Sequence, residues 1–136
     1  MKGFLNNLDF REIGEKDGRI VYKLNSPLFY VSDSIEVVIP VGFETDLASV
    51  PRVPVVYTAW GDKAHREAVL HDYLYRIDSK PVVERDRADY CFKEAMISRG
   101  QPLRVYYPMW LGVRIGGGSS FHRICVQDSY KLDVTY

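Results

Sequence analysis

Two adjacent residues that could carry acid–base chemistry, His71 and Asp72, lie inside the apolar stretch AVLHDYLYR at 68–76. Histidine is the side chain whose ordinary pKa is closest to neutral pH, so it can take up and release protons there. Neighbours on an α-helix point about 100° apart, so the two side chains suit two adjoining tasks rather than one small target. Tyr75 would share the face of His71, and Arg76 could pair with Asp72.

A second acid, Asp89, follows in the segment RADYCF. Antiparallel packing of its helix on the first one would bring this carboxylate to the far ring nitrogen of His71. A carboxylate there fixes the tautomer of the imidazole and raises its basicity. The alternative is an ordinary solvated acid beside Arg85 and Arg87, a role for which Asp86 is the better candidate.

The simpler interpretation of the His–Asp pair is structural: Asp72 forms an exposed pair with Arg76, and His71 is a satisfied core histidine. The apolar residues on both sides of the pair make that interpretation less favourable here. His65 lies on the face of Asp72 but six residues before His71, about 120° away. The spacing of a helical zinc site is i, i+4, so zinc held by these two histidines is not expected.

The third candidate element is FETDLASVPR, residues 43–52, where Thr45 and Asp46 follow a strand and Ser49 sits within a proline-stiffened loop. Loops of this kind position polar groups over a scaffold. No Gly-x-Ser-x-Gly elbow surrounds Ser49 to mark it as a nucleophile. Capping and packing of a turn by these side chains is an equally good interpretation, so both stay open.

Strand formers dominate the first half of the chain, and helical spacing dominates the second. Runs of β-branched and aromatic residues bounded by turn formers predict strands at 18–24, 27–31 and 35–40. Two prolines make 47–54 an extended loop. Helices are predicted at 63–76, 82–98 and 102–115. The fold class is therefore α+β, with antiparallel strands followed by a helical half that contains two packed antiparallel helices.

The ends of these helices also have sequence signals. Asp62 is a plausible N-cap of the first helix, and Gly100 a C′ residue of the second. Pro108 should kink the third helix or mark its true start. We expect a single domain over 1–136, with strands in 1–56, helices in 62–115, a glycine-rich break at 116–120 and a tail that could add a strand.

Composition excludes some classes of function. The chain has 136 residues, 46% of them hydrophobic, and its 18 basic residues balance 18 acidic ones. Nucleic-acid binding is therefore not expected, although the segment from Arg99 to Arg123 is locally basic. Cys91 and Cys125 are too few for a disulfide framework. No secretion signal and no apolar run of membrane-spanning length is visible.

Three blocks, FETDLASVPR, HREAVLHDYLY and RADYCFKEAM, occur in that order within about residues 35–115. Together they resemble a phage and prophage family known as domain of unknown function 1353. The resemblance implies a phage or prophage gene product, often encoded near tail or lysis functions, located in the host cytoplasm or the virion. It brings no established activity.

The pair LHDYLYR and RADYCF is also similar to the two catalytic helices of phospholipase A2, notably its small bacterial forms. That similarity implies His71 as general base for water, Asp72 as a calcium ligand, Asp89 as the residue that orients His71, and Tyr75 as a hydrogen-bond partner of Asp89. The chain departs from the family in two respects. It lacks the glycine-rich calcium loop, since YTAWGDK holds one glycine, and it lacks the paired disulfide cysteines.

Two functions follow as hypotheses. The first is a hydrolase, which requires a cleft where water reaches His71, with calcium as a possible cofactor. The second is a non-enzymatic phage protein, either virion or tail-associated or interacting with a host protein. Its polar residues, His71, Asp72 and Asp46, would form a closed network that pins the loop 43–54 to the helices.

The segment RVYYPMWLGVR motivates the second hypothesis, because it carries residue types that are typical of interface anchors. These are Tyr106, Tyr107, Trp110 and Arg114. A core helix is the alternative interpretation of the same segment. The sequence does not distinguish the oligomeric state.

Overall fold

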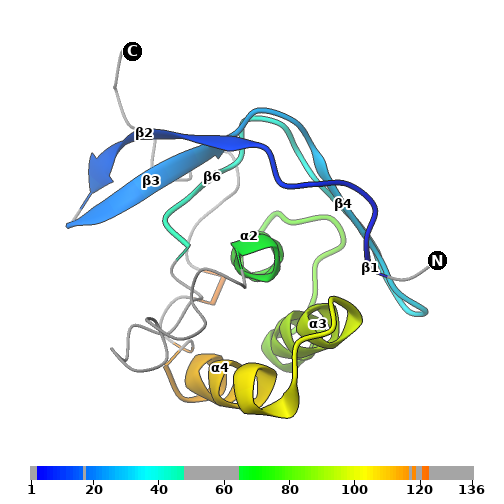
Figure 1. Ribbon diagram of the computed structural model, residues 1–136. Helices are drawn as coiled ribbons and strands as arrows, with labels where there is room; N and C mark the ends of the chain where they lie inside the picture. Colours follow the sequence, from blue (N-terminus) through cyan, green and yellow to red (C-terminus); the bar gives the residue numbers. More distant parts are fainter. Residues whose placement is uncertain (1–2, 17, 48–64, 117, 119–120, 123–136) are drawn as a thin grey trace.

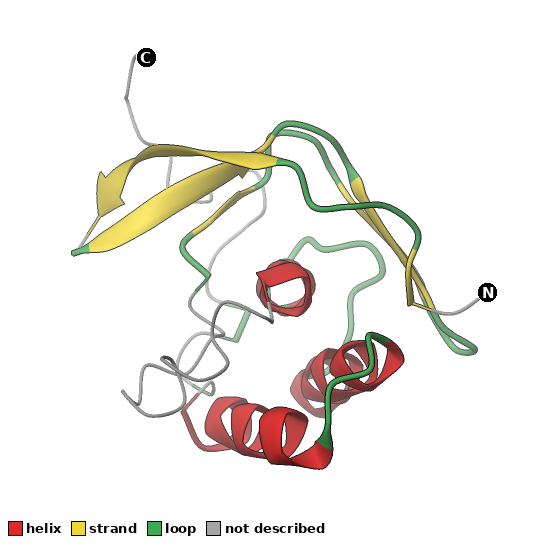
Figure 2. Ribbon diagram, in the orientation of Figure 1, coloured by secondary structure: helices red, strands yellow, loops and turns green. Residues whose placement is uncertain are grey.

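The computed structural model describes residues 3–16, 18–47, 65–116, 118 and 121–122. The described strands all precede the described helices, which confirms the α+β class and its order (Figures 1 and 2). The strands are β1 (Gly3–Phe4), β2 (Phe10–Lys16), β3 (Arg19–Leu24), β4 (Leu28–Val31), β5 (Glu36–Ile39) and β6 (Glu44–Thr45). The helices are α2 (His65–Leu74), α3 (Arg85–Ser98) and α4 (Leu103–Gly116).

The strands form two antiparallel sheets, one with the order β1-β4-β5 and one with the order β2-β3-β6. Side chains alternate between the two faces of a strand, and β4 follows this rule: Leu28 and Tyr30 are buried, whereas Phe29 is exposed. Their partners across the pair, Ile39 and Val37, are buried too. The buried faces of the strands point toward the helices.

Helix α2 lies at the centre of the molecule, between the sheets and the pair α3 and α4 (Figure 1). Every residue from Glu67 to Leu74 is buried. A helix that is covered on all sides shows no amphipathic pattern, and any polar side chain on it must find a partner inside the protein.

The predicted helices are all present among the described residues, with ends that differ by a few residues. The second helix ends as expected: Gly100 has a φ of 81° and follows the C-cap residue. Pro108 lies inside α4 rather than at its start, so the prediction that it could mark the true start is wrong. Proline has no backbone N–H, so α4 lacks the hydrogen bond that residue 108 would otherwise donate to the carbonyl of Arg104. The predicted N-cap Asp62, most of the loop 47–54, and the tail after residue 122 lie outside the described residues.

Helices α2 and α3 pack in antiparallel fashion, as predicted, because Glu67 at the start of α2 contacts Arg99 just after α3, whereas Tyr75 just after α2 contacts Arg85 at the start of α3. Helix α4 covers α3 through its own buried row, Val105, Met109 and Val113. None of the helices in the described part of the chain is both long enough and apolar enough to span a membrane.

Candidate functional site

The polar side chains of α2 leave the helix in different directions and contact different elements. His71 contacts Asp89 on α3, and Asp72 contacts Thr45 on β6. The angle between neighbouring residues on a helix explains this divergence. As the sequence suggests, His71 and Asp72 have different roles: each connects the central helix to a different element.

The His71 contact is short and completely buried. Nε2 of His71 lies 2.5 Å from Oδ1 of Asp89, and the hydroxyl of Tyr75 donates to the same oxygen at 2.6 Å. Exposed fractions are 1% for His71 and 0% for Asp89. The rings of Tyr75 and Phe92 flank the imidazole, with centroids 4.1 and 5.0 Å from its own. All three residues expected to act together are thus in contact.

Two arginines complete the surroundings of Asp89. Nη1 of Arg114, on α4, donates to Oδ2 at 2.7 Å, and Nε of Arg85 lies 3.8 Å from the same oxygen. Arg85 also donates to the backbone carbonyls of Val113 and Arg114, at 3.0 and 2.5 Å. These carbonyls belong to the last turn of α4, where cationic groups are favourable. One carboxylate therefore connects all three described helices.

The charge of Asp89 follows from these contacts. Burial by itself raises the pKa of this carboxyl, but the hydrogen bonds from His71, Tyr75 and Arg114 outweigh burial and hold its pKa below the usual range. Burial, and then the hydrogen bond to Asp89, raise the pKa of Tyr75. Tyr75 is therefore a donor and Asp89 an ionised acceptor.

This assignment determines the tautomer of His71. An ionised carboxylate only accepts hydrogen bonds, so Nε2 of His71 carries a proton and donates it to Asp89. In a neutral imidazole with a protonated Nε2, the other nitrogen, Nδ1, holds the lone pair. Nδ1 is then the nitrogen that could accept a proton from water.

The buried side chain of Thr45 helps to fix the segment 43–47 to α2. The hydroxyl of Thr45, which is completely buried, donates to Oδ2 of Asp72, and the backbone N–H of Leu47 donates to the Thr45 oxygen at 3.0 Å. Leu47 has a φ of 57°, an unusual value for a leucine. Asp46 is half-buried beside this turn, and Ser49 lies outside the described residues.

The structural interpretation placed Asp72 and Arg76 on the surface, and the structure buries both side chains. Asp72 and Arg76 expose only 6% and 5% of their surface, and the Arg76 guanidinium lies over the ring of Phe43, 5.6 Å from its centroid. His65 begins α2, where its ring contacts Phe10 of β2. It is therefore part of the contact between α2 and the sheet rather than of the cluster around Asp89.

The sequence interpretation missed the ion pair of Arg114 with Asp89, and it also missed a second pair, which Glu67 forms. Glu67 is 0% exposed, and its carboxylate accepts hydrogen bonds from Arg99 at 2.8 and 3.3 Å. Burial raises the pKa of Glu67 even though Arg99 opposes that shift. The sequence did offer one signal for Glu67. It lies four residues before His71, so it places a charged side chain on the same face of the helix.

The calcium site that the resemblance implies stays a prediction, because residues 57–63, the stretch before α2, lie outside the described residues. Calcium takes six to eight oxygen ligands. Asp72, the expected ligand, accepts the Thr45 hydroxyl with one of its two oxygens. In the part of the chain that the structure describes, no three His, Cys, Asp or Glu side chains gather as metal ligands.

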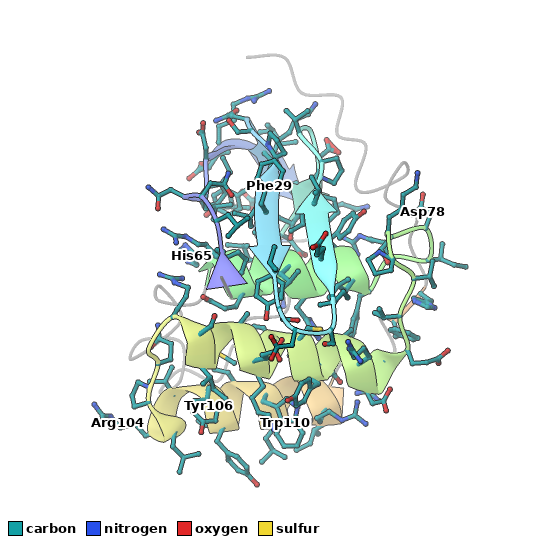
Figure 3. The ribbon with its side chains drawn as sticks, turned by 90° about the vertical axis from the view of Figure 1, so that its right-hand side faces the viewer. Phe29, His65, Asp78, Arg104, Tyr106 and Trp110 are labelled. Atoms are coloured by element: carbon teal, nitrogen blue, oxygen red, sulfur yellow. The ribbon has the colours of Figure 1, made fainter. Side chains whose placement is uncertain are left out.

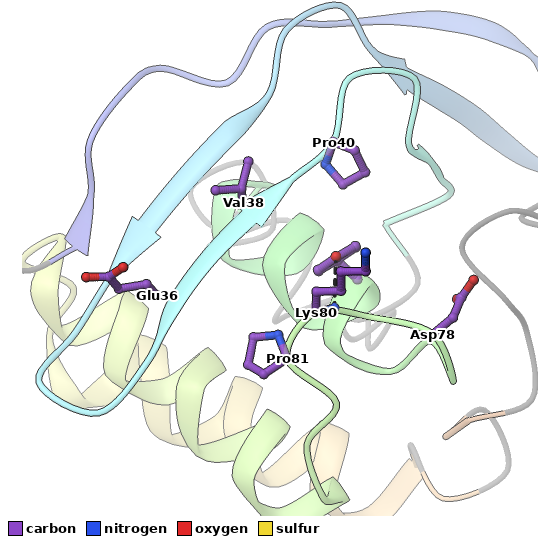
Figure 4. A pocket seen from close by; sticks show the side chains of 7 residues that line it. Glu36, Val38, Pro40, Asp78, Lys80 and Pro81 are labelled. Atoms are coloured by element: carbon purple, nitrogen blue, oxygen red, sulfur yellow. Dashed lines mark hydrogen bonds between the residues drawn. The ribbon is translucent and has the colours of Figure 1, made fainter.

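Two surface grooves are lined by described residues. One, of about 590 Å³, lies between β5 and the loop after α2 (Figure 4), and its lining comprises Glu36, Val38, Pro40, Tyr73, Asp78, Lys80 and Pro81. The other, of about 650 Å³, runs from the start of α3 to α4, and its lining comprises Val83, Glu84, Asp86, Arg87, Tyr90, Trp110 and Arg114. His71 lines neither groove. The second reaches the site only through Arg114.

Comparison with known proteins identifies a family. A family model described as "Protein of unknown function (DUF1353)" matches residues 22–113, well over half of the chain. The chain therefore belongs to this family, as the three sequence blocks predicted. No curated protein matches it, and no solved structure does.

Proposed function

We propose that the protein is a hydrolase in which His71 removes a proton from water while Asp89 orients the ring. The observation that supports this best is the pair of short contacts on one carboxylate oxygen, from His71 at 2.5 Å and Tyr75 at 2.6 Å. The resemblance to phospholipase A2 implies the same residues in the same roles. We therefore propose an ester as the substrate, and a phospholipid ester before others.

In the proposed reaction, water gives a proton to Nδ1 of His71 while its oxygen attacks the ester carbonyl carbon. The imidazolium keeps its Nε2–H on Asp89, whose negative charge offsets the new positive charge. When the tetrahedral intermediate collapses, the ester C–O bond breaks and the proton passes from Nδ1 to the departing alkoxide. Tyr75 and Arg114 hold the carboxylate during both transfers.

This reaction requires water and substrate to reach a ring that is 1% exposed. The proposal therefore includes an opening motion around α2 that exposes His71, as conformational steps do in many enzymes. Such a motion would make opening, rather than proton transfer, a candidate for the slow step.

The same burial favours a second candidate function, a non-enzymatic phage protein that is tail-associated, part of the virion or bound to a host protein. Here the cluster around Asp89 would be structural. A buried network whose members are all hydrogen-bonded can specify one packing arrangement without any reaction. Phage or prophage origin, in either case, rests on the resemblance of the three sequence blocks.

An assay of two esters separates the candidates: p-nitrophenyl acetate, and phosphatidylglycerol in vesicles. His71→Gln and Glu67→Gln form a matched pair, because both side chains are buried on α2 and bonded to α3 or its C-cap. The hydrolase proposal expects His71→Gln to lose at least about a hundredfold in rate, with Glu67→Gln retaining activity. A folded wild-type protein that hydrolyses neither ester, or a His71→Gln protein as active as wild type, would overturn it.

A further inference from the structure

The outer face of α4 carries a row of exposed apolar side chains that the proposed reaction does not use. They recur every four residues: Leu103, Tyr107, Leu111 and Ile115. Their exposed fractions are 62, 49, 39 and 79%. Residues four apart share one face of a helix, so the row is continuous along the helix.

The opposite face of α4 is already occupied. Its buried row, Val105, Met109 and Val113, is about half a turn away from the exposed row and packs inward. In Figure 3, α4 is the layer farthest from the strands, with Arg104 near its first residues and Trp110 farther along. The exposed row is therefore on an outer surface of the molecule.

The charges that α4 itself carries are of one sign. Its 14 residues include two arginines, Arg104 and Arg114, and no aspartate or glutamate, although the whole chain has a net charge of 0. Arg104 lies on the exposed face itself, and Nζ of Lys93 lies over the Trp110 ring, 4.7 Å from its centroid. The outer face of α4 thus combines aliphatic, aromatic and cationic groups, and the helix itself contributes no acid. Such a face complements an anionic, partly apolar partner.

We propose that the outer face of α4 binds the surface of an anionic lipid bilayer, with the helix lying in the plane of the interface. Helices that combine an apolar face with cationic flanks bind in this way. The 14 residues of α4 extend over about 21 Å, less than the roughly 30 Å of a bilayer core. Trp and Tyr are favoured at the level of the lipid headgroups. This inference goes beyond the proposed reaction and holds whether or not His71 is catalytic.

Other occupants match the surface less well. A second copy of the chain, paired through α4, would bring together two helices that contribute no acid of their own. Arg114 already pairs with Asp89, but no acid on either helix would offset the charge of Arg104. Nucleic acids are contacted mainly through phosphates and base edges, which would leave the Leu, Leu and Ile side chains in water. An anionic bilayer offers acyl chains to the apolar side chains of α4 and negative headgroups to its arginine.

Co-sedimentation with vesicles tests the proposal, using equal parts of phosphatidylglycerol and phosphatidylcholine against phosphatidylcholine alone. The test variant is Leu111→Glu with Ile115→Glu, and the control is Val41→Glu, an exposed apolar position (61%) on the strand side. We expect the wild type and the control to bind the anionic vesicles. We expect the double variant to bind at least about tenfold more weakly, because it replaces two apolar side chains that the bilayer would bury with two negative charges that anionic headgroups repel.

Further outcomes complete the test. Added salt and Arg104→Gln should each weaken binding to the anionic vesicles, and His71→Gln should leave it unchanged. Equal binding by the double variant and the Val41→Glu control would overturn the proposal, as would failure of the wild type to bind. Dimerisation that the double variant abolishes, without vesicle binding, would show that a second copy occupies the face instead.

Discussion

Replacement of Asp89 by asparagine tests the central cluster most directly, because it keeps the shape of the side chain and removes its charge. The carboxylate accepts hydrogen bonds from His71, Tyr75 and Arg114 at 2.5, 2.6 and 2.7 Å. An amide has one oxygen acceptor and two N–H donors. Whichever way it turns, a donor of the amide faces a donor of the cluster.

The cost in stability follows from these contacts. Removal of one partner of a buried ion pair costs about 3–5 kcal/mol. Since Arg114 is 33% exposed, water compensates part of the loss, and we expect a decrease of about 3 kcal/mol in the free energy of unfolding. Domains are typically stable by about 5–15 kcal/mol, so the variant should still fold.

The effect on activity is separate and larger. An amide N–H that faces Arg114 would oppose its donors, so the amide N–H₂ should turn toward His71. Nε2 of His71 must then accept, and the ring proton moves to Nδ1, the nitrogen that the proposed reaction needs as a base. A wrong tautomer of this kind lowers kcat by about 10⁴.

Urea unfolding and ester hydrolysis, measured on the same preparations, check both expectations. The stability difference also depends on pH. Because the folded pKa of Asp89 lies below its ordinary value, the carboxylate contributes its stability above the unfolded pKa of about 3.9. That contribution is lost as the pH falls through the lower folded pKa. A decrease in the free energy of unfolding of less than about 1 kcal/mol at neutral pH, well below the expected range, would refute the reasoning. So would a difference between wild type and variant that does not narrow in acid.

The remaining predictions concern the other buried contacts. Thr45→Val should lower the free energy of unfolding by about 1–3 kcal/mol, since Asp72 loses a buried donor; a neutral effect in urea unfolding would contradict this. Tyr75→Phe removes one donor from Asp89 and should reduce kcat about tenfold with little change in KM, which steady-state kinetics would show. Burial raises the folded pKa of Glu67. The contribution of Glu67 to the free energy of unfolding is therefore largest below its unfolded pKa of about 4.3, and it is lost as the pH rises through the folded pKa. The stability of Glu67→Gln relative to wild type should therefore increase with rising pH. Urea unfolding midpoints that show the opposite trend would exclude a raised pKa of Glu67.

The local order of the chain was predictable because it depends on neighbours in the sequence. Alternation and turn formers predicted β3, β4 and β5, and a positive φ at the end of α3 follows from Gly100. The three blocks also predicted the family that the match over 22–113 identifies. Spacing predicted that His71 and Asp72 would face different partners, since that angle is a property of any α-helix.

What only the tertiary structure decided is which partners those side chains meet and how much water reaches them. Burial of α2 on all sides depends on two sheets and two helices that come from distant parts of the chain. The ion pair of Glu67 with Arg99, 32 residues apart, and the bond between Arg114 and Asp89 likewise require the packed helices. Helical spacing alone determines the face on which a residue lies. Whether that face is closed depends on packing, and the 1% exposure of His71 is a result of that packing.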